Sequence, residues 1–235
     1  MAGFGAFGKM PALGDFFRLG APPGFVKPWD AWLQDGIVAS RSIMGDRWQA
    51  SYLTAPVWRF SLGAGVAGPA VTVGVLMPSV DRVGRQFPLT LMAAISETAS
   101  AMRVHLKAVS QFELLEEIAL DTLDDAMNRD ALAERLQAVP PVVVGSGAGF
   151  DIVCKNGCVA MTATFASSDA PASVMDMIGE LTQDGLERAC VWSAILAGET
   201  RLLITDGLPR AGQMAALFDL DAPQWRADAQ EGART

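Results

Sequence analysis

The sequence predicts an α+β fold, an α/β/α-type sandwich in which helices flank a mostly antiparallel sheet. Uncharged runs of strand length, such as 71–77 and 87–95, alternate with segments of helical periodicity such as 26–44. Of the 235 residues, 51% are hydrophobic and only 19% are charged, so the chain has enough apolar area for a full-sized core. We therefore expect two closely packed lobes and not a disordered chain.

The first elements are expected to be a short strand and a long helix. Small and aromatic residues alternate over residues 3–8, which favours a strand there. Pro28 suits the first turn of a helix over roughly Val26 to Met44, and Gly45 is placed to end it. Apolar residues recur at helical spacing within this range, so one face of the helix should be buried.

The uncharged stretch Phe60 to Val80 has about the length that a membrane-spanning helix needs. Gly63, Gly65, Gly68 and two prolines within it would interrupt a helix, whereas its two ends have the composition of strands. The sequence therefore predicts strands near 57–60 and 71–77, joined by a glycine-rich loop, and no membrane insertion. A third uncharged run at 87–95 should join the same sheet and be buried on both faces.

Residues 101–136 follow a helical pattern, with a second short helix beginning near Asp130. The inward face of the longer, first helix is expected to hold Phe112, Leu115, Ala119, Thr122, Leu123 and Ala126. Its outward face is acidic and holds Glu113, Glu116, Glu117, Asp121, Asp124 and Asp125. Pro140 and Pro141 then end the helix and mark the best boundary between an N-terminal lobe, 1–139, and a C-terminal lobe, 140–222.

The C-terminal lobe should return to strands. They are expected at 142–144, 158–165, 189–196 and 202–205, with one helix starting at Ser173 and another over 211–218. The tail 223–235 is polar, and we expect it to fray.

Composition and charge exclude several functions. The chain has 18 basic and 26 acidic side chains, a formal charge of −8, with the basic residues scattered, so nucleic-acid binding is disfavoured. No basic segment followed by an apolar run opens the chain, which argues against a signal peptide. Three cysteines, an odd number in apolar context, indicate buried thiols in the reducing cytoplasm.

Two glycine-rich segments imitate nucleotide-binding loops. Residues 3–9 satisfy G-x-x-x-x-G-K, but Met10 stands where the loop needs a hydroxyl for Mg²⁺, and Pro11 discourages the helix that should follow. The second segment, 145–149, lacks the helix that a dinucleotide fingerprint requires. A flexible loop explains it better.

Signatures of catalysis are missing as well. The only histidine, His105, lies near the start of a helix, and no nucleophile motif surrounds any serine or cysteine. Cys154 and Cys158 lack further ligands for zinc. We expect no catalytic residue, no metal and no cofactor.

The acidic helix face has three possible interpretations, and it is represented by Glu113, Glu117, Asp121 and Asp124. A solvated outer face explains its spacing most simply. A divalent cation and a basic docking partner are the other two.

The most informative polar cluster lies in the loop from Met77 to Pro88. It brings Ser79, Asp81, Arg82 and Arg85 together between two apolar strands, with prolines stiffening both sides. Asp81 can pair with one arginine, and Asp15 in the N-terminal loop could reach the other. A structural ion-pair network and a binding site are both consistent with this pattern.

Four longer motifs carry a family resemblance. They are Gly8-Lys9-Met10-Pro11 with Gly14-Asp15-Phe16, Pro28-Trp29-Asp30-Ala31-Trp32-Leu33, the segment 52–60 (YLTAPVWRF), and the Met77 to Pro88 loop. In this order they resemble the TagF/ImpM family of type VI secretion-associated proteins, over roughly residues 4–95 within the N-terminal lobe.

The resemblance implies a cytoplasmic, non-enzymatic accessory protein that holds assembly or firing of the secretion apparatus in check after translation. It implies the forkhead-associated scaffold protein of the system as the partner. The family assigns no catalysis to the matching positions, so they are expected to be partner-binding or structural: Lys9, Asp15, Ser79, Asp81, Arg82 and Arg85. The alternative is a nucleotide- or phosphate-sensing enzyme that uses the loop arginines with Lys9.

Overall fold

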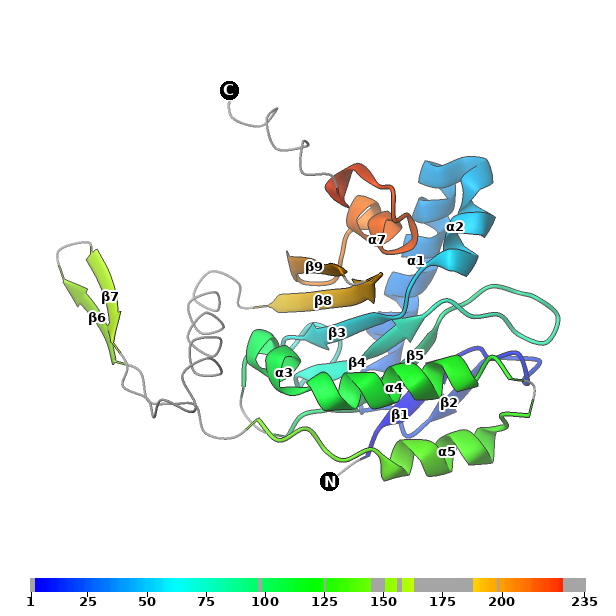
Figure 1. Ribbon diagram of the computed structural model, residues 1–235, viewed down its shortest axis with the longest axis horizontal. Coiled ribbons are helices and arrows are strands. Elements are labelled where there is room, and N and C mark those ends of the chain that lie inside the picture. The colour runs from blue at the N-terminus through cyan, green and yellow to red at the C-terminus, as the bar shows by residue number, and fades with distance from the viewer. Residues whose placement is uncertain are drawn as a thin grey trace.

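A seven-stranded antiparallel sheet forms the centre of the molecule (Figure 1). The computed structural model describes residues 3–96, 99–124, 126–144, 151–155, 158–162, 188–197 and 199–225. In spatial order the strands are β2 (Phe17–Leu19), β1 (Gly5–Gly8), β5 (Leu89–Ala94), β4 (Thr72–Met77), β3 (Trp58–Leu62), β8 (Ala189–Leu196) and β9 (Glu199–Asp206). A separate hairpin consists of β6 (Asp151–Lys155) and β7 (Cys158–Thr162).

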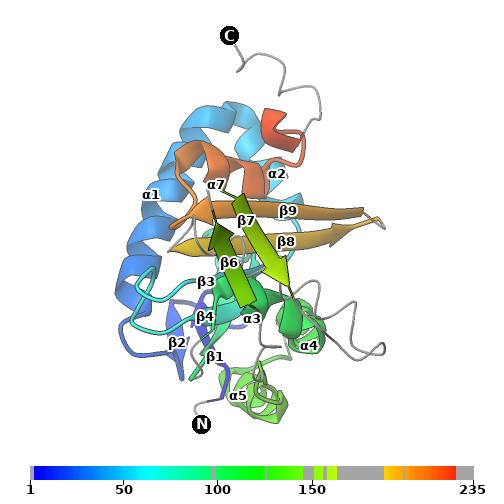
Figure 2. The ribbon, with the colours of Figure 1, turned by 90° about the vertical axis from the view of Figure 1, so that its left-hand side faces the viewer.

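Helices cover both faces of the sheet (Figures 1 and 2). One face carries α1 (Val26–Met44), α2 (Trp48–Thr54) and α7 (Ala211–Phe218), with the short helices η1 (Gly45–Arg47) and η2 (Pro223–Trp225) at their ends. The other face carries α3 (Ala101–Lys107), α4 (Val109–Asp121) and α5 (Arg129–Ala138). Each layer has its own apolar core against the sheet. The predicted sandwich with a mostly antiparallel sheet is confirmed.

Strands from both predicted lobes share this sheet. β3 of the N-terminal lobe pairs with β8 of the C-terminal lobe, so that Phe60 lies opposite Trp192. Both rings contact the ring of Trp29 in α1, at centroid distances of 4.9 and 6.1 Å. The lobes are therefore joined through backbone hydrogen bonds and through a common aromatic core.

Most of the predicted elements occur where the sequence placed them. α1 has the expected bounds, and Gly45 ends it with a positive φ of 56° while donating its N–H to the carbonyl of Arg41. β3 and β4 pair across the glycine-rich loop, and no described helix is long and apolar enough to cross a membrane. At the C-terminal end, η2 places Trp225 on Trp58, with 5.6 Å between ring centroids.

Several expectations need correction. The second helix predicted near Asp130 occurs as α5, but the segment before it forms two helices and not one, because the chain breaks at Ala108, and α4 ends at Asp121. Leu123, expected inside, is therefore exposed together with Ala126. Residues 142–144 form no strand, although Val142 and Val144 are buried. β2 and α2 were not predicted. The loop at 145–149 and the helix from Ser173 lie outside the described residues.

Candidate functional site

The loop between β4 and β5 is folded on itself. Val80 and Gln86 form a β-bridge, and the N–H of Phe87 donates to the carbonyl of Ser79. Gly84 closes the turn with a φ of 82°, a conformation that glycine adopts without strain. The loop is therefore a defined hairpin that projects from the sheet.

Asp81 organises this hairpin from inside. Its carboxylate accepts hydrogen bonds from the Lys9 ammonium at 2.9 Å and from Nε of Arg85 at 2.6 Å. It also accepts from the backbone N–H groups of Val83 and Arg85, at 3.1 and 2.9 Å. The Asp81 side chain is fully buried and that of Lys9 almost so. A buried carboxylate with four donors is fully satisfied, as a buried charge must be.

The electrostatics of Asp81 follow from these contacts. Burial favours the neutral acid, but the hydrogen bonds from Lys9, Arg85 and Val83 outweigh burial and hold the pKa of the carboxyl well below its usual range. Asp81 is therefore ionised at neutral pH, and its carboxylate forms ion pairs with Lys9 and Arg85.

Close packing of the backbone explains the glycines before Lys9 without a bound phosphate. Gly8 has a φ of 133°, and a Cβ there would lie 2.1 Å from the carbonyl oxygen of Pro88. A Cβ on Gly5 would lie 2.5 Å from the backbone of Gly20. Both glycines permit close backbone approach in and around β1, after which the chain enters a turn and not a helix. Lys9 consequently points at Asp81 and is unavailable to a phosphate group.

Ser79 is held through its backbone. The hydroxyl of Tyr52 in α2 donates to the Ser79 carbonyl at 2.8 Å and accepts from the Ser79 N–H at 3.0 Å. Burial raises the pKa of Tyr52, so the phenol stays neutral. The Ser79 hydroxyl is buried and has no hydrogen-bond partner within the described residues. Sequence reasoning missed Tyr52, because it lies 27 residues from Ser79.

The N-terminal loop is fastened to the outer part of the hairpin. The N–H of Arg82 donates to the carbonyl of Leu13 at 2.9 Å, and the Arg85 guanidinium donates to the carbonyl of Gly14 at 2.7 Å. Both arginines have exposed side chains.

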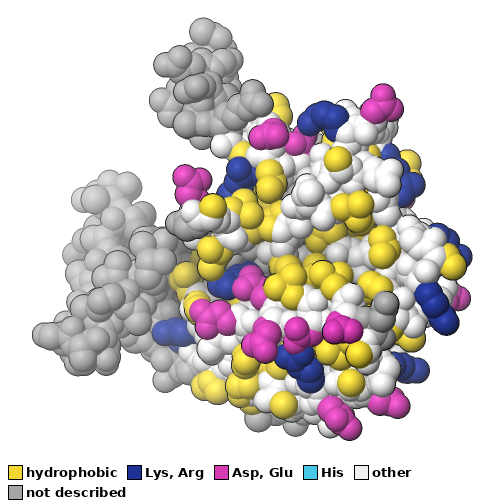
Figure 3. Space-filling view, turned by 45° about the vertical axis from the view of Figure 1, so that its right-hand side comes forward, with side chains coloured by type: hydrophobic (Ala, Val, Ile, Leu, Met, Phe, Trp, Pro, Cys, Tyr) yellow, Lys and Arg dark blue, Asp and Glu magenta, His cyan; other side chains and the backbone are white. Residues whose placement is uncertain are grey.

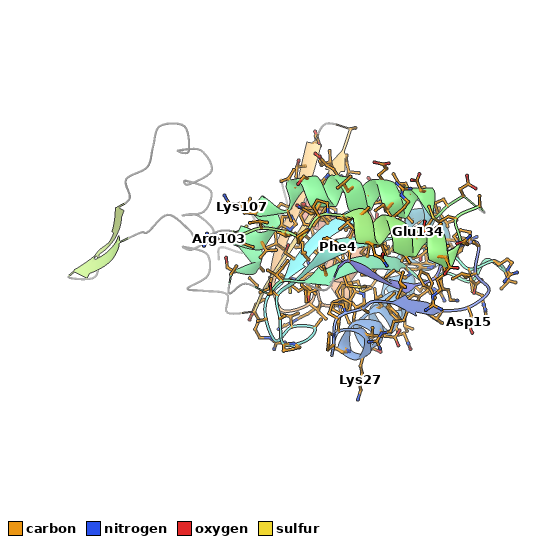
Figure 4. All side chains as sticks on the ribbon, turned by 90° about the horizontal axis from the view of Figure 1, so that it is seen from below. Phe4, Asp15, Lys27, Arg103, Lys107 and Glu134 are labelled. Atoms are coloured by element: carbon orange, nitrogen blue, oxygen red, sulfur yellow. The ribbon has the colours of Figure 1, made fainter. Side chains whose placement is uncertain are left out.

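Asp15 does not pair with either arginine. Its carboxylate accepts from the N–H of Phe16 at 2.8 Å, closing a local turn, and no ion pair to Asp15 occurs among the described residues. Figure 4 shows Asp15 at the outer edge of the molecule. The expected pairing is wrong because this local hydrogen bond holds the carboxylate within its own exposed turn.

The two loops together expose an apolar and basic surface. Phe16 is 47% exposed and Val83 is 72% exposed, although both are large apolar residues. Phe16 rests on the ring of Phe87 at 4.7 Å and under the Lys9 ammonium at 4.7 Å. We call Phe16, Arg82, Val83 and Arg85 the two-loop surface. Its base is buried and fixed, while its outer side chains face solvent.

The acidic face of α4 is partly occupied by intramolecular ion pairs. Glu117 and Asp121 both contact Arg135 of α5. Glu113 is exposed, and Figure 3 shows Asp and Glu side chains in a row across this face. Asp124, expected on the same helix, is exposed but lies beyond the end of α4 at Asp121. Among the described residues no group of three or more metal-ligating side chains occurs, which gives the cation reading no support.

Glu116 belongs to the fold and not to the acidic face. It binds Arg59 of β3 through two hydrogen bonds of 2.7 Å, and this bond to Glu116 is the main cause of the raised pKa of Arg59. The Arg59 side chain is only 8% exposed, so its buried positive charge needs the carboxylate of Glu116 as a compensating partner. The two residues are 57 positions apart, and the sequence contains no signal that pairs them.

His105 joins three elements through two serines. Its Nδ1 lies 3.1 Å from the hydroxyl of Ser61 in β3, and its Nε2 lies 2.8 Å from the hydroxyl of Ser193 in β8. Burial, with a smaller effect of the nearby Arg59 charge, lowers the pKa of His105 to about 3. The buried ring therefore stays neutral at pH 7, and its two serine contacts connect α3 to strands β3 and β8 of the sheet.

Comparison with known proteins places this geometry in context. Residues 5–139 match the family described as "TagF N-terminal domain, Type VI secretion system-associated". The crystal structure of PA0076 from Pseudomonas aeruginosa PAO1 is similar with a TM-score of 0.68 and 28% sequence identity, over 92% of this chain and 93% of that chain. No curated protein matches. The matched segment contains both loops of the two-loop surface.

Proposed function

The chain belongs to the family of type VI secretion system-associated proteins defined by the TagF N-terminal domain, and we propose that it represses type VI secretion after translation by binding a component of the apparatus. The partner we propose is the forkhead-associated scaffold protein, which the motif resemblance implies, and the place is the cytoplasm. In this proposal the protein is a non-enzymatic accessory factor.

The observation that supports this proposal most is the build of the two-loop surface. Contacts from Lys9 and Arg85 to the buried Asp81 carboxylate fix the loops, so little conformational entropy remains to be lost when a partner binds. An exposed Phe16 and Val83 beside exposed arginines match the composition of protein interfaces, which favour aromatic residues and arginine. The two-loop surface therefore combines a rigid, buried base with exposed apolar side chains, as expected of a surface that binds a protein partner.

The buried state of the candidate chemical groups supports a binding role over the enzyme alternative. Lys9 is paired with Asp81, and His105 lies between two serines in the interior. A nucleotide- or phosphate-sensing enzyme would need Lys9 free to contact phosphate. Its signature would be a ligand-dependent rise in Tm with ATP, GTP or phosphate, which we expect to be absent.

Co-precipitation with the forkhead-associated scaffold tests the proposal. Val83→Asp places a carboxylate in the apolar part of the two-loop surface, and we expect it to abolish most of the binding. Val38→Asp is the matched control, because Val38 in α1 is 69% exposed against 72% for Val83. Equal capture of both variants, with both folded, would place the interface elsewhere. Lack of capture of the unsubstituted protein would remove the scaffold as partner.

A further inference from the structure

A shallow recess of about 460 Å³ lies beside the two-loop surface. It is lined by Arg41, Trp48, Gln49, Gly84, Arg85 and Gln86. These residues come from the C-terminal end of α1, from the start of α2 and from the hairpin. No carboxylate lines the recess, although the chain as a whole has a formal charge of −8. The recess is thus a local positive site on an acidic protein.

Both guanidinium groups of the recess are held in place. Arg41 donates to Oε1 of Gln86 at 3.2 Å and lies over the ring of Trp48 at 5.5 Å. The indole N–H of Trp48 donates to the same oxygen at 2.8 Å. Arg85 is fixed by Asp81 and by the Gly14 carbonyl. Preorganised arginines lose less entropy when they bind an anion than free ones do.

These contacts leave N–H donors unused. A guanidinium has five N–H groups, of which Arg41 uses one and Arg85 two in hydrogen bonds among the described residues. The Gln86 amide nitrogen also has no hydrogen-bond partner in that part of the chain, while its oxygen accepts twice. The recess therefore combines positive charge with several free donors, which is the chemistry that oxyanions require.

We propose that this recess binds carboxylate side chains of the partner protein that docks on the two-loop surface. The proposal rests on the proposed function, since Arg85 belongs both to the recess and to that surface. A partner that covers Phe16 and Val83 would lie next to the recess. An acidic residue at that point would meet Arg41, which has no ion pair among the described residues, and the N–H groups of Arg85 that Asp81 and Gly14 leave unused. The recess would then select an acidic partner segment.

The test uses the isolated full chain and a hexaglutamate peptide as the probe. In a ¹⁵N spectrum of the indole N–H groups, we expect hexaglutamate at low ionic strength to shift the signal of Trp48, assigned by its loss in Trp48→Phe. The signal of Trp58, whose indole donates to the buried carbonyl of Leu217, should stay in place. Hexaglutamine should shift neither. This readout needs no secretion component, so it can fail while the proposed function holds, and the reverse.

Arg41→Ala should weaken hexaglutamate binding about fivefold or more, because an exposed ion pair with charge-assisted hydrogen bonds is lost. Lys27→Ala is the matched control. It removes the same charge from the other end of α1, about 21 Å away along the helix, where Figure 4 shows Lys27 pointing away from the body. Equal binding by Arg41→Ala, or no shift of Trp48, would overturn the proposal. A shift with inorganic phosphate but not with hexaglutamate would also overturn it, since the site would then take phosphate.

Discussion

The ammonium of Lys9 lies 2.9 Å from the carboxylate of Asp81, and both side chains are buried. The two residues are 72 positions apart, so their contact ties the end of β1 to the hairpin that follows β4. Burial of both charges makes the pair sensitive to the loss of either partner. The two-loop surface depends on this contact for its rigidity.

Replacing Lys9 should loosen the hairpin. In Lys9→Met the Asp81 charge stays buried with one cationic partner fewer, so we expect Tm to fall by roughly 5 °C or more. Adding Asp81→Asn should recover part of that loss, because the uncompensated charge is removed. Differential scanning calorimetry of the single and double variants measures this. A double variant whose loss equals the sum of the two single losses would show that the pair is not coupled.

Stability should fall in acid because of His105. Its pKa is about 3 in the folded protein against about 6.5 unfolded, so between these values the unfolded chain binds more protons. Folding therefore loses stability as the pH falls from 6.5 toward 3, by about 2 kcal/mol at pH 5 from this residue. Urea unfolding at pH 7 and pH 5 measures the difference. His105→Gln, which has no proton to gain, should show a smaller pH dependence; an unchanged one would contradict the assignment.

Replacing two different glutamates of α4 should change the free energy of unfolding by different amounts. Glu116→Ala leaves the buried Arg59 charge without its carboxylate and should cost about 2 kcal/mol of unfolding free energy. Glu113→Ala removes an exposed acid one turn away, and its effect should stay within about 0.5 kcal/mol. Chemical denaturation of both variants gives the comparison. Similar losses in the two would mean that the Arg59 pair does not stabilise the fold.

Much of the fold can be predicted from the spacing of apolar residues and from the positions of proline and glycine. Pro28, the helical spacing after it and Gly45 locate α1. The strand composition near 57–60 locates β3, and the uncharged runs at 71–77 and 87–95 locate β4 and β5. α2 escaped prediction because its stability comes from packing: the rings of Trp48 and Tyr52 rest on Phe218, far along the chain. β2 has only three residues, too few for a periodic signal.

The candidate site was predictable only where its members are close in sequence. The sequence predicts that Asp81 pairs with one of the two loop arginines, and the structure shows that the partner is Arg85, four residues away. Lys9, Tyr52 and Arg41 reach the hairpin from other elements, and only the three-dimensional arrangement brings them there. The local hydrogen bond that keeps Asp15 from the arginines likewise depends on the turn in which it lies.

The proposed repression of type VI secretion through the two-loop surface is measured by the amount of a secreted component of the apparatus in the culture medium of strains that overexpress the protein. We expect the unsubstituted protein and Val38→Asp to reduce secretion strongly, and Val83→Asp to leave it near the level of the empty vector, at equal amounts of folded protein. Full repression by Val83→Asp, or unchanged secretion with the unsubstituted protein, would contradict repression through the two-loop surface.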